Sequence, residues 1–300
     1  MPPPAPSPSP LGPSPLDPSP LDRLRERLRA VGLPDMTGAG VLPLGAAIDR
    51  HLPGGGLARG ALHEVAGSGA EAEQGAAAAS LFVAGALARL PGPVVWAIGT
   101  ADAPPFAPAL DAVGLHADRV IYAEAGAPDA VLMVMEEALR LPGLAGVVGE
   151  IEGTLSLTAS RRLHLAAQAG GVIGFALRRP RRVAAAGLDA PNAAATRWRV
   201  IPLPSAPPDP VAPEIGLGPA RWRLELWRCR GGAPRVWIAE AWDGGRDSAW
   251  DSPRGAPRDH RGEGVAADRG GLSAHLADGP DTPAAGRPAA GGDAAGRRVA

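Results

Sequence analysis

The sequence contains no lysine. All 30 basic residues are arginine, which excludes a Schiff-base lysine, a lysine general base and the lysine of a phosphate-binding loop. The single cysteine, Cys229, excludes an internal disulfide bond. No apolar run approaches the roughly 20 residues that a membrane helix needs, and residues 1–20 lack a basic segment leading into an apolar one. We therefore expect a cytosolic protein without membrane contact.

Composition divides the chain into five segments. Residues 1–20 are mostly proline and serine, and residues 243–300 carry few large apolar groups. Because such segments bury too little apolar surface to offset chain entropy, we expect both to be disordered. Residues 21–34 contain leucines at helical spacing and predict a short amphipathic helix. Between these segments lie a core, residues 40–182, and an extension rich in arginine and tryptophan, residues 183–242.

The core alternates between two kinds of apolar pattern. Runs of strand length occur at 61–66, 93–99, 119–123, 144–150 and 171–177. The stretches between them have the composition and spacing of helices, at 74–90, 108–113, 129–141 and 157–169. Five such alternations predict an α/β fold, a doubly wound and mostly parallel sheet with helices on its faces.

The pattern changes after residue 178. Residues 197–203, 221–227 and 235–241 alternate between polar and apolar side chains, as half-exposed strands do, with a Gly-Gly turn at 231–232. They predict an antiparallel β extension at the C-terminal end of the sheet. Charge changes too: residues 61–160 hold 12 acidic residues and 3 arginines, whereas residues 161–235 hold 13 arginines and 4 acidic residues.

A degenerate phosphate loop follows the first core strand. A working loop reads GxxxxGK[ST], and its lysine and hydroxyl contact phosphate and magnesium. Residues 67–77 read GSGAEAEQGAA, with two glutamates where a triphosphate would sit. Alanine occupies both the lysine and the hydroxyl positions. We expect this loop not to bind nucleotide; its residues are Gly67, Gly69, Gly75, Ala76 and Ala77.

Carboxylates occur near the ends of two other core strands. Glu150 lies where a nucleotide-binding fold would carry its magnesium-coordinating acid, Glu152 follows it, and Asp102 follows the second strand. They are either metal ligands or carboxylates paired with arginines, and the second interpretation is favoured because the loop lacks its cation. The histidines and the lone cysteine have no zinc-ligand spacing. We expect neither a metal nor a cofactor.

The extension repeats an Arg-Trp-Arg pattern. In a strand, the arginines of this pattern share one face and the tryptophan lies on the other, so we expect buried tryptophans and an outward arginine surface. That surface can bind an acidic partner or DNA phosphates, or can simply be solvated. Trp250, in the C-terminal tail, is either a short docking motif or part of an unselected extension. The surface arginines are Arg197, Arg199, Arg221, Arg223, Arg228 and Arg230.

Three stretches together resemble the ImuA family. They are LPGGGLARGALHEV at 52–65, ATRWRV at 195–200 and RWRLELWRCRGG at 221–232. The entry into the first core strand also looks like that of RecA-type proteins. The resemblance covers roughly residues 21–240 and implies a RecA-like core.

The resemblance implies a function as well as a fold. ImuA proteins belong to an SOS-induced mutagenesis cassette and act with ImuB, a Y-family-like polymerase homologue, and with an error-prone DnaE-type polymerase. The implied role is a non-catalytic scaffold in translesion synthesis, with RecA as a further candidate partner. Three alternatives stay open: a single-stranded DNA-binding module, a RecA-type ATPase that uses Arg59 in place of lysine, and a SulA-like inhibitor of cell division.

Overall fold

The computed structural model describes residues 26, 40–68, 72–99, 103–179, 190–205, 218–242, 272 and 274–276. Of the predicted helix at 21–34, only Glu26 is described, and it is helical; the rest of that helix lies outside the described residues. The same is true of residues 1–20 and of most of residues 243–300. None of the described helices combines the length and the hydropathy of a membrane span.

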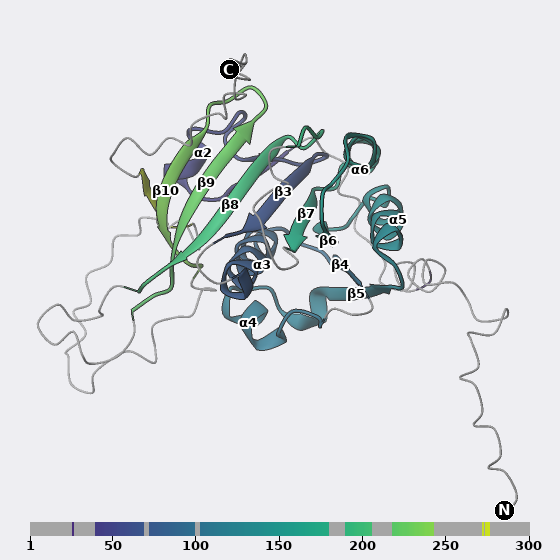
Figure 1. Cartoon of the computed structure of the whole chain (residues 1–300), viewed down its shortest axis with the longest axis horizontal. Coiled ribbons are helices and arrows are strands. Elements are labelled where there is room, and N and C mark those ends of the chain that lie inside the picture. The colour runs from purple at the N-terminus through teal and green to yellow at the C-terminus, as the bar shows by residue number, and fades with distance from the viewer. Residues whose placement is uncertain are drawn as a thin grey trace, which may run out of the picture.

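Nine strands of the described chain form one sheet, in the order β11-β10-β9-β8-β3-β7-β6-β4-β5 (Figure 1). Within the group of six strands from β3 to β8, each pair of neighbouring strands is parallel. The last three are antiparallel additions at one side of the sheet. This arrangement confirms the predicted α/β fold with a C-terminal antiparallel extension. However, residues 197–203, predicted as part of that extension, form a strand that runs parallel to β3 and antiparallel to β9. The strands are β3 (Leu62–Gly67), β4 (Val94–Gly99), β5 (Val120–Ala125), β6 (Gly146–Glu152), β7 (Gly174–Arg179), β8 (Thr196–Leu203), β9 (Arg221–Cys229), β10 (Arg235–Glu240) and β11 (Ala274–Leu276).

Helices cover both faces of the parallel part. The helices α3 (Ala72–Ala88) and α4 (Ala107–Ala112) contribute to one apolar core, and α5 (Pro128–Leu139) and α6 (Leu157–Gly170) contribute to the other. A 3-10 turn, η1 (Ala117–Arg119), leads into β5. Ser156 caps the start of α6, because its Oγ accepts a hydrogen bond from the Ala159 amide at 3.2 Å.

Three short elements escaped prediction. They are β1 (Val41–Leu42), α2 (Ala46–Asp49) and β2 (Leu57–Ala58); β1 and β2 pair with each other, and all three lie before β3. The strand β11 falls within residues 243–300, which the sequence assigns to a disordered tail, and it pairs with β10. Next to it, the buried Leu272 donates its amide to the Leu44 carbonyl at 2.8 Å. These contacts fasten a short piece of the tail to the start of the fold.

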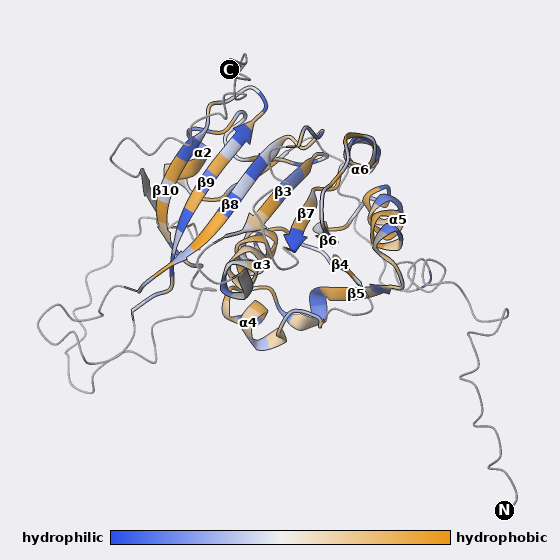
Figure 2. Ribbon diagram, viewed as in Figure 1, coloured by the Kyte–Doolittle hydropathy of each residue, from blue (hydrophilic) through white to orange (hydrophobic). Residues whose placement is uncertain are grey.

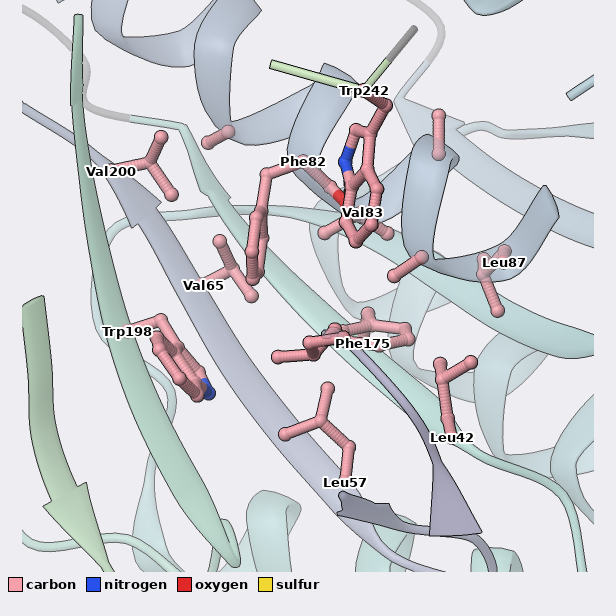
Figure 3. Packing of buried hydrophobic residues seen from close by; sticks show 14 of the residues in the cluster. Leu42, Leu57, Val65, Phe82, Val83, Leu87, Phe175, Trp198, Val200 and Trp242 are labelled. Carbon is pink, nitrogen blue, oxygen red and sulfur yellow. Dashed lines mark hydrogen bonds between the residues drawn. The ribbon is translucent and has the colours of Figure 1, made fainter. Parts of the chain in front are cut away.

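The extension shares its hydrophobic core with α3. Along β8, β9 and β10, hydrophobic and hydrophilic residues alternate (Figure 2), and the inward residues include Trp198, Trp222 and Trp237. Phe82 of α3 lies between Trp198 and Trp242 (Figure 3), with ring centroids 5.7 and 6.2 Å away. The extension therefore continues the core sheet and packs as part of the same unit.

Candidate functional site at the carboxyl edge of the sheet

The parallel strands β3, β4, β6 and β7 end at one edge of the sheet, and α3 begins there. In open α/β sheets this carboxyl edge is where ligands bind. The edge brings together the described part of the predicted phosphate loop, Glu150 near the end of β6 and Arg179 at the end of β7. Gly69 lies outside the described residues, as does Asp102.

The turn from β3 into α3 is closed by direct backbone packing. A Cβ atom on Gly67 would lie 2.1 Å from the carbonyl carbon of Gly75, and one on Gly75 would lie 2.7 Å from the amide nitrogen of Ser68. Only glycine fits at either position. The Ser68 amide is itself bonded to the Val200 carbonyl of β8 at 2.9 Å. This amide is therefore committed to the sheet and is not offered to a phosphate.

Neither side chain at the positions of the lysine and the hydroxyl can bind phosphate or magnesium. Ala76 is buried and Ala77 is exposed, and both carry only a methyl group. The nearest hydroxyl on the helix, Ser80 Oγ, donates to the Ala76 carbonyl at 3.0 Å. The edge therefore supplies no cation in the lysine position and no hydroxyl in the magnesium position.

Glu150 is buried and its two carboxylate oxygens are both occupied. Trp96 Nε1 donates to Oε1 at 2.9 Å, and Arg179 Nε donates to Oε2 at 2.6 Å. Of the two interpretations drawn from the sequence, the arginine pair is the one that forms. A carboxylate held this way has little freedom to coordinate a metal, and within the described residues no three metal-ligating side chains gather. Burial raises the pKa of the nearby Tyr122, and the charge of Glu150 adds to this rise.

Arg59, the arginine considered as a replacement for the loop lysine, lies at the opposite edge of the sheet from the loop. It precedes β3, whereas the loop follows β3, so the length of a six-residue strand separates them, about 20 Å. Its neighbour Gly60 lies close to Ala167 and Gly171, at the carboxyl end of α6, which is the opposite edge of the sheet. This position argues against a role for Arg59 in place of the lysine.

A cavity of about 470 Å³ opens at the carboxyl edge. Its walls come from α3, from the segment that leads into α4, and from the end of β7. Apolar side chains predominate; among the described residues Arg179 is the one ionisable side chain in the lining, and Phe106 is 73% exposed at the margin. This cavity could not be predicted from the sequence, because its two main walls are about 25 residues apart in the chain. The lining residues are Ala76, Ala77, Ser80, Leu81, Ala103, Pro104, Pro105, Phe106, Ala109, Leu110 and Arg179.

The expected arginine surface is largely tied up in contacts within the protein. Arg197 is buried and binds Glu64 at 2.5 Å, so the expectation that it faces solvent is wrong. Arg199 and Arg223 both contact the buried Glu225, at 3.3 and 3.0 Å. Arg221 is only partly exposed. Ion pairs with Glu64 and Glu225 therefore hold Arg197, Arg199 and Arg223 against the sheet.

Arg228 and Arg230 are exposed, as expected, but they too contact the protein. Arg228 Nη1 donates to the Asn192 carbonyl at 3.1 Å, and Arg230 Nη2 donates to the Ala193 carbonyl at 3.2 Å. Both contacts hold the segment that leads into β8. Because these arginines donate hydrogen bonds to backbone carbonyls, fewer of their N–H groups are available to bind DNA phosphates.

A buried polar cluster around Glu64 was missed by the sequence analysis. Its carboxylate accepts hydrogen bonds from Arg178 Nη1 at 2.9 Å, Asn192 Nδ2 at 2.7 Å and Arg197 Nε at 2.5 Å. Glu64 itself has no exposed surface. The four residues come from β3, β7, the segment before β8, and β8. The periodicity that places Glu64 in a strand gives no sign of its partners.

The expected inward orientation is wrong for one tryptophan, Trp227. It lies five residues after Trp222, so strand alternation itself places the two on opposite faces. A β-bulge adjoins it. Trp198 pairs with Leu226 and Arg197 pairs with Arg228, which leaves Trp227 as an extra residue in β9. Trp198 and Trp222 face the core as predicted. Trp227 instead lies on the other face, where the Arg199 guanidinium sits 3.7 Å from its ring centre.

Comparison with known proteins gives a consistent relationship. The chain is similar to Protein ImuA of Caulobacter vibrioides, in strain NA1000 and in strain ATCC 19089 alike. Each shares 44% identity over 206 residues, which cover 66% of this chain and 82% of the relative. No family model matches the chain.

Proposed function

This chain belongs to the ImuA family, and on that premise we propose that it is a non-catalytic accessory protein of SOS-induced translesion DNA synthesis. In this proposal it works as a RecA-like scaffold in the cytoplasm, together with ImuB and an error-prone DnaE-type polymerase. RecA is a further candidate partner. The protein contributes contacts between macromolecules, and the polymerase contributes the chemistry.

The observation that carries the proposal is the chemistry of the carboxyl edge. Phosphoryl transfer needs a cation on the β- and γ-phosphates and a metal held by a hydroxyl and a carboxylate. Here methyl groups stand at the first two positions, and the carboxylate of Glu150 is bound by Trp96 and Arg179. An edge built this way favours a binding role over ATP hydrolysis.

The same contacts weigh against direct binding of single-stranded DNA. A phosphate-tracking surface needs cations that face solvent. Arg197, Arg199 and Arg223 are each paired with a glutamate, so their charges are partly neutralised. A protein partner therefore fits the extension better than a nucleic acid does.

The proposal is tested by ultraviolet-induced mutagenesis in the host of this chain. Deleting the coding sequence should lower the frequency of induced mutations, and restoring the full chain should recover it. Arg59→Ala should restore the frequency equally well, because Arg59 lies at the opposite edge from the loop. Unchanged mutagenesis after deletion would contradict the proposed function.

A further inference from the structure

The cavity at the carboxyl edge occupies the region where a nucleotide-binding fold places its phosphates. Its α3 wall presents Ala76 and Ala77, so methyl groups line it where a phosphate-binding loop would carry lysine and a hydroxyl residue. A volume of about 470 Å³ is within the range of ligand-binding pockets. The cavity therefore has the size of a binding site and walls that suit an apolar group.

Phe106 is the most exposed large apolar residue in the described part of the chain, at 73%. It caps the start of α4 and borders the cavity. An aromatic ring held at the margin of an apolar hollow buries further surface when a partner covers it, as in the central contacts of protein interfaces. This pairing of an aromatic ring with an apolar cavity distinguishes the site from Leu165, an exposed leucine on α6.

Arg179 adds a charged group to one wall. Its Nε nitrogen is fixed by Glu150 at 2.6 Å, and about a third of the side chain is exposed. Within the described residues its two Nη nitrogens make no hydrogen bond. An arginine oriented by one carboxylate through Nε can use its Nη groups to bind a second one.

We propose that this cavity is a docking site for a peptide segment of a partner protein that inserts a bulky apolar side chain and places a carboxylate beside it. The apolar side chain would fill the hollow between α3 and α4 and cover Phe106. The carboxylate would meet Arg179. This inference rests on the proposed function, since it assigns the contact with ImuB to a defined surface.

The test measures binding of purified ImuB to the full-length protein by biolayer interferometry. Ala77→Phe fills the cavity from an exposed helix position and should weaken binding at least about tenfold. Its matched control is Ala169→Phe, an exposed alanine on α6, on the other face of the sheet. Phe106→Ala should also weaken binding about tenfold, and its control Leu165→Ala should change it less than about twofold. Thermal melts of each variant establish that it is folded.

The charged contact has its own variant. Arg179→Gln combined with Glu150→Gln removes both charges and retains side chains that can hydrogen-bond to each other, so it avoids leaving Glu150 buried and unpaired. It should weaken ImuB binding about tenfold. Unchanged binding would overturn the assignment of a partner carboxylate to Arg179.

The remaining outcomes separate the two proposals. Failure of the wild-type chain to bind ImuB would overturn the proposed function and this inference with it. Binding that Ala77→Phe and Phe106→Ala leave unchanged would overturn the inference alone.

Discussion

Several glutamate side chains in this protein are buried and form ion pairs with arginines. Glu64, Glu150 and Glu225 are all nearly inaccessible, and each contacts at least one arginine. Since arginine stays protonated and can bond through several N–H groups, it suits such pairs better than lysine would. The absence of lysine thus coincides with a fold in which arginine stabilises internal acids.

Replacing Glu64 tests this pairing directly. Glu64→Gln keeps the shape of the side chain and removes the charge that Arg178 and Arg197 share. We expect a loss of about 3–5 kcal/mol in the free energy of unfolding, because two buried cations lose their counter-ion. Urea titration measures the loss, with the exposed Glu124→Gln as control. A loss below about 1 kcal/mol would show that the cluster is not important for stability.

His63 should make stability depend on pH. Burial lowers its pKa from 6.5 to about 4, against a smaller opposing effect of its hydrogen bond to the Ala58 carbonyl. The unfolded chain then binds more protons between these values, so stability is full above pH 6.5 and falls as the pH drops toward 4. The full loss is about 3 kcal/mol.

Urea unfolding between pH 7 and pH 4 checks this dependence. His63→Gln removes the titrating group, and its stability should fall less steeply than that of the wild type over the same range. Because His51 and His164 also have lowered pKa values, the comparison between the two proteins matters more than either curve alone. Identical slopes would rule out His63 as the source.

At the scale of elements, the close approach of Trp242 to α3 explains a glycine inside that helix. A Cβ atom on Gly85 would lie 1.9 Å from Cδ1 of Trp242, whose Nε1 donates to the Phe82 carbonyl at 3.2 Å. Glycine in a helix interior costs about 1 kcal/mol relative to alanine. The close approach of the indole offsets that cost by fastening the end of β10 to the core.

Exchanging Gly85 should therefore have opposite effects in two backgrounds. In the wild type, Gly85→Ala should lower stability, because the indole must move. In Trp242→Ala the same substitution should raise stability by up to about 1 kcal/mol, since only helix propensity remains. A double-mutant cycle by urea unfolding measures both. The same sign in both backgrounds would contradict the proposed packing.

The elements of the core could be predicted from sequence because their cues are local. Apolar runs and helical spacing are read within about 15 residues, and β3 to β7 appear where these cues place them. The pairing of β11 with β10 and the cluster around Glu64 depend on contacts more than 30 residues apart. The bulge in β9 shifts the pairing with β8 by one residue between Leu226 and Arg228, and the sequence pattern gives no sign of it. The outward face of Trp227, by contrast, follows from strict alternation along β9. The walls of the cavity beside Phe106 are likewise far apart in the chain, so the cavity can be recognised only in the folded structure.

At the scale of the whole molecule, one sheet joins the carboxyl edge to the extension. β8 is hydrogen-bonded to β3 on one side and to β9 on the other, and Ser68 at the loop bonds to Val200 of β8. A partner at the edge and a partner at the extension would therefore meet a single packed unit. This arrangement suits a scaffold that positions two proteins relative to each other.

Whether the carboxyl edge holds a nucleotide is measured by isothermal titration of MgATP into the full-length protein. We expect no saturable heat up to about 1 mM nucleotide, because the cation, the hydroxyl and a free carboxylate are missing from the edge. Saturable binding with a dissociation constant in the micromolar range, abolished by Ala77→Phe, would contradict it.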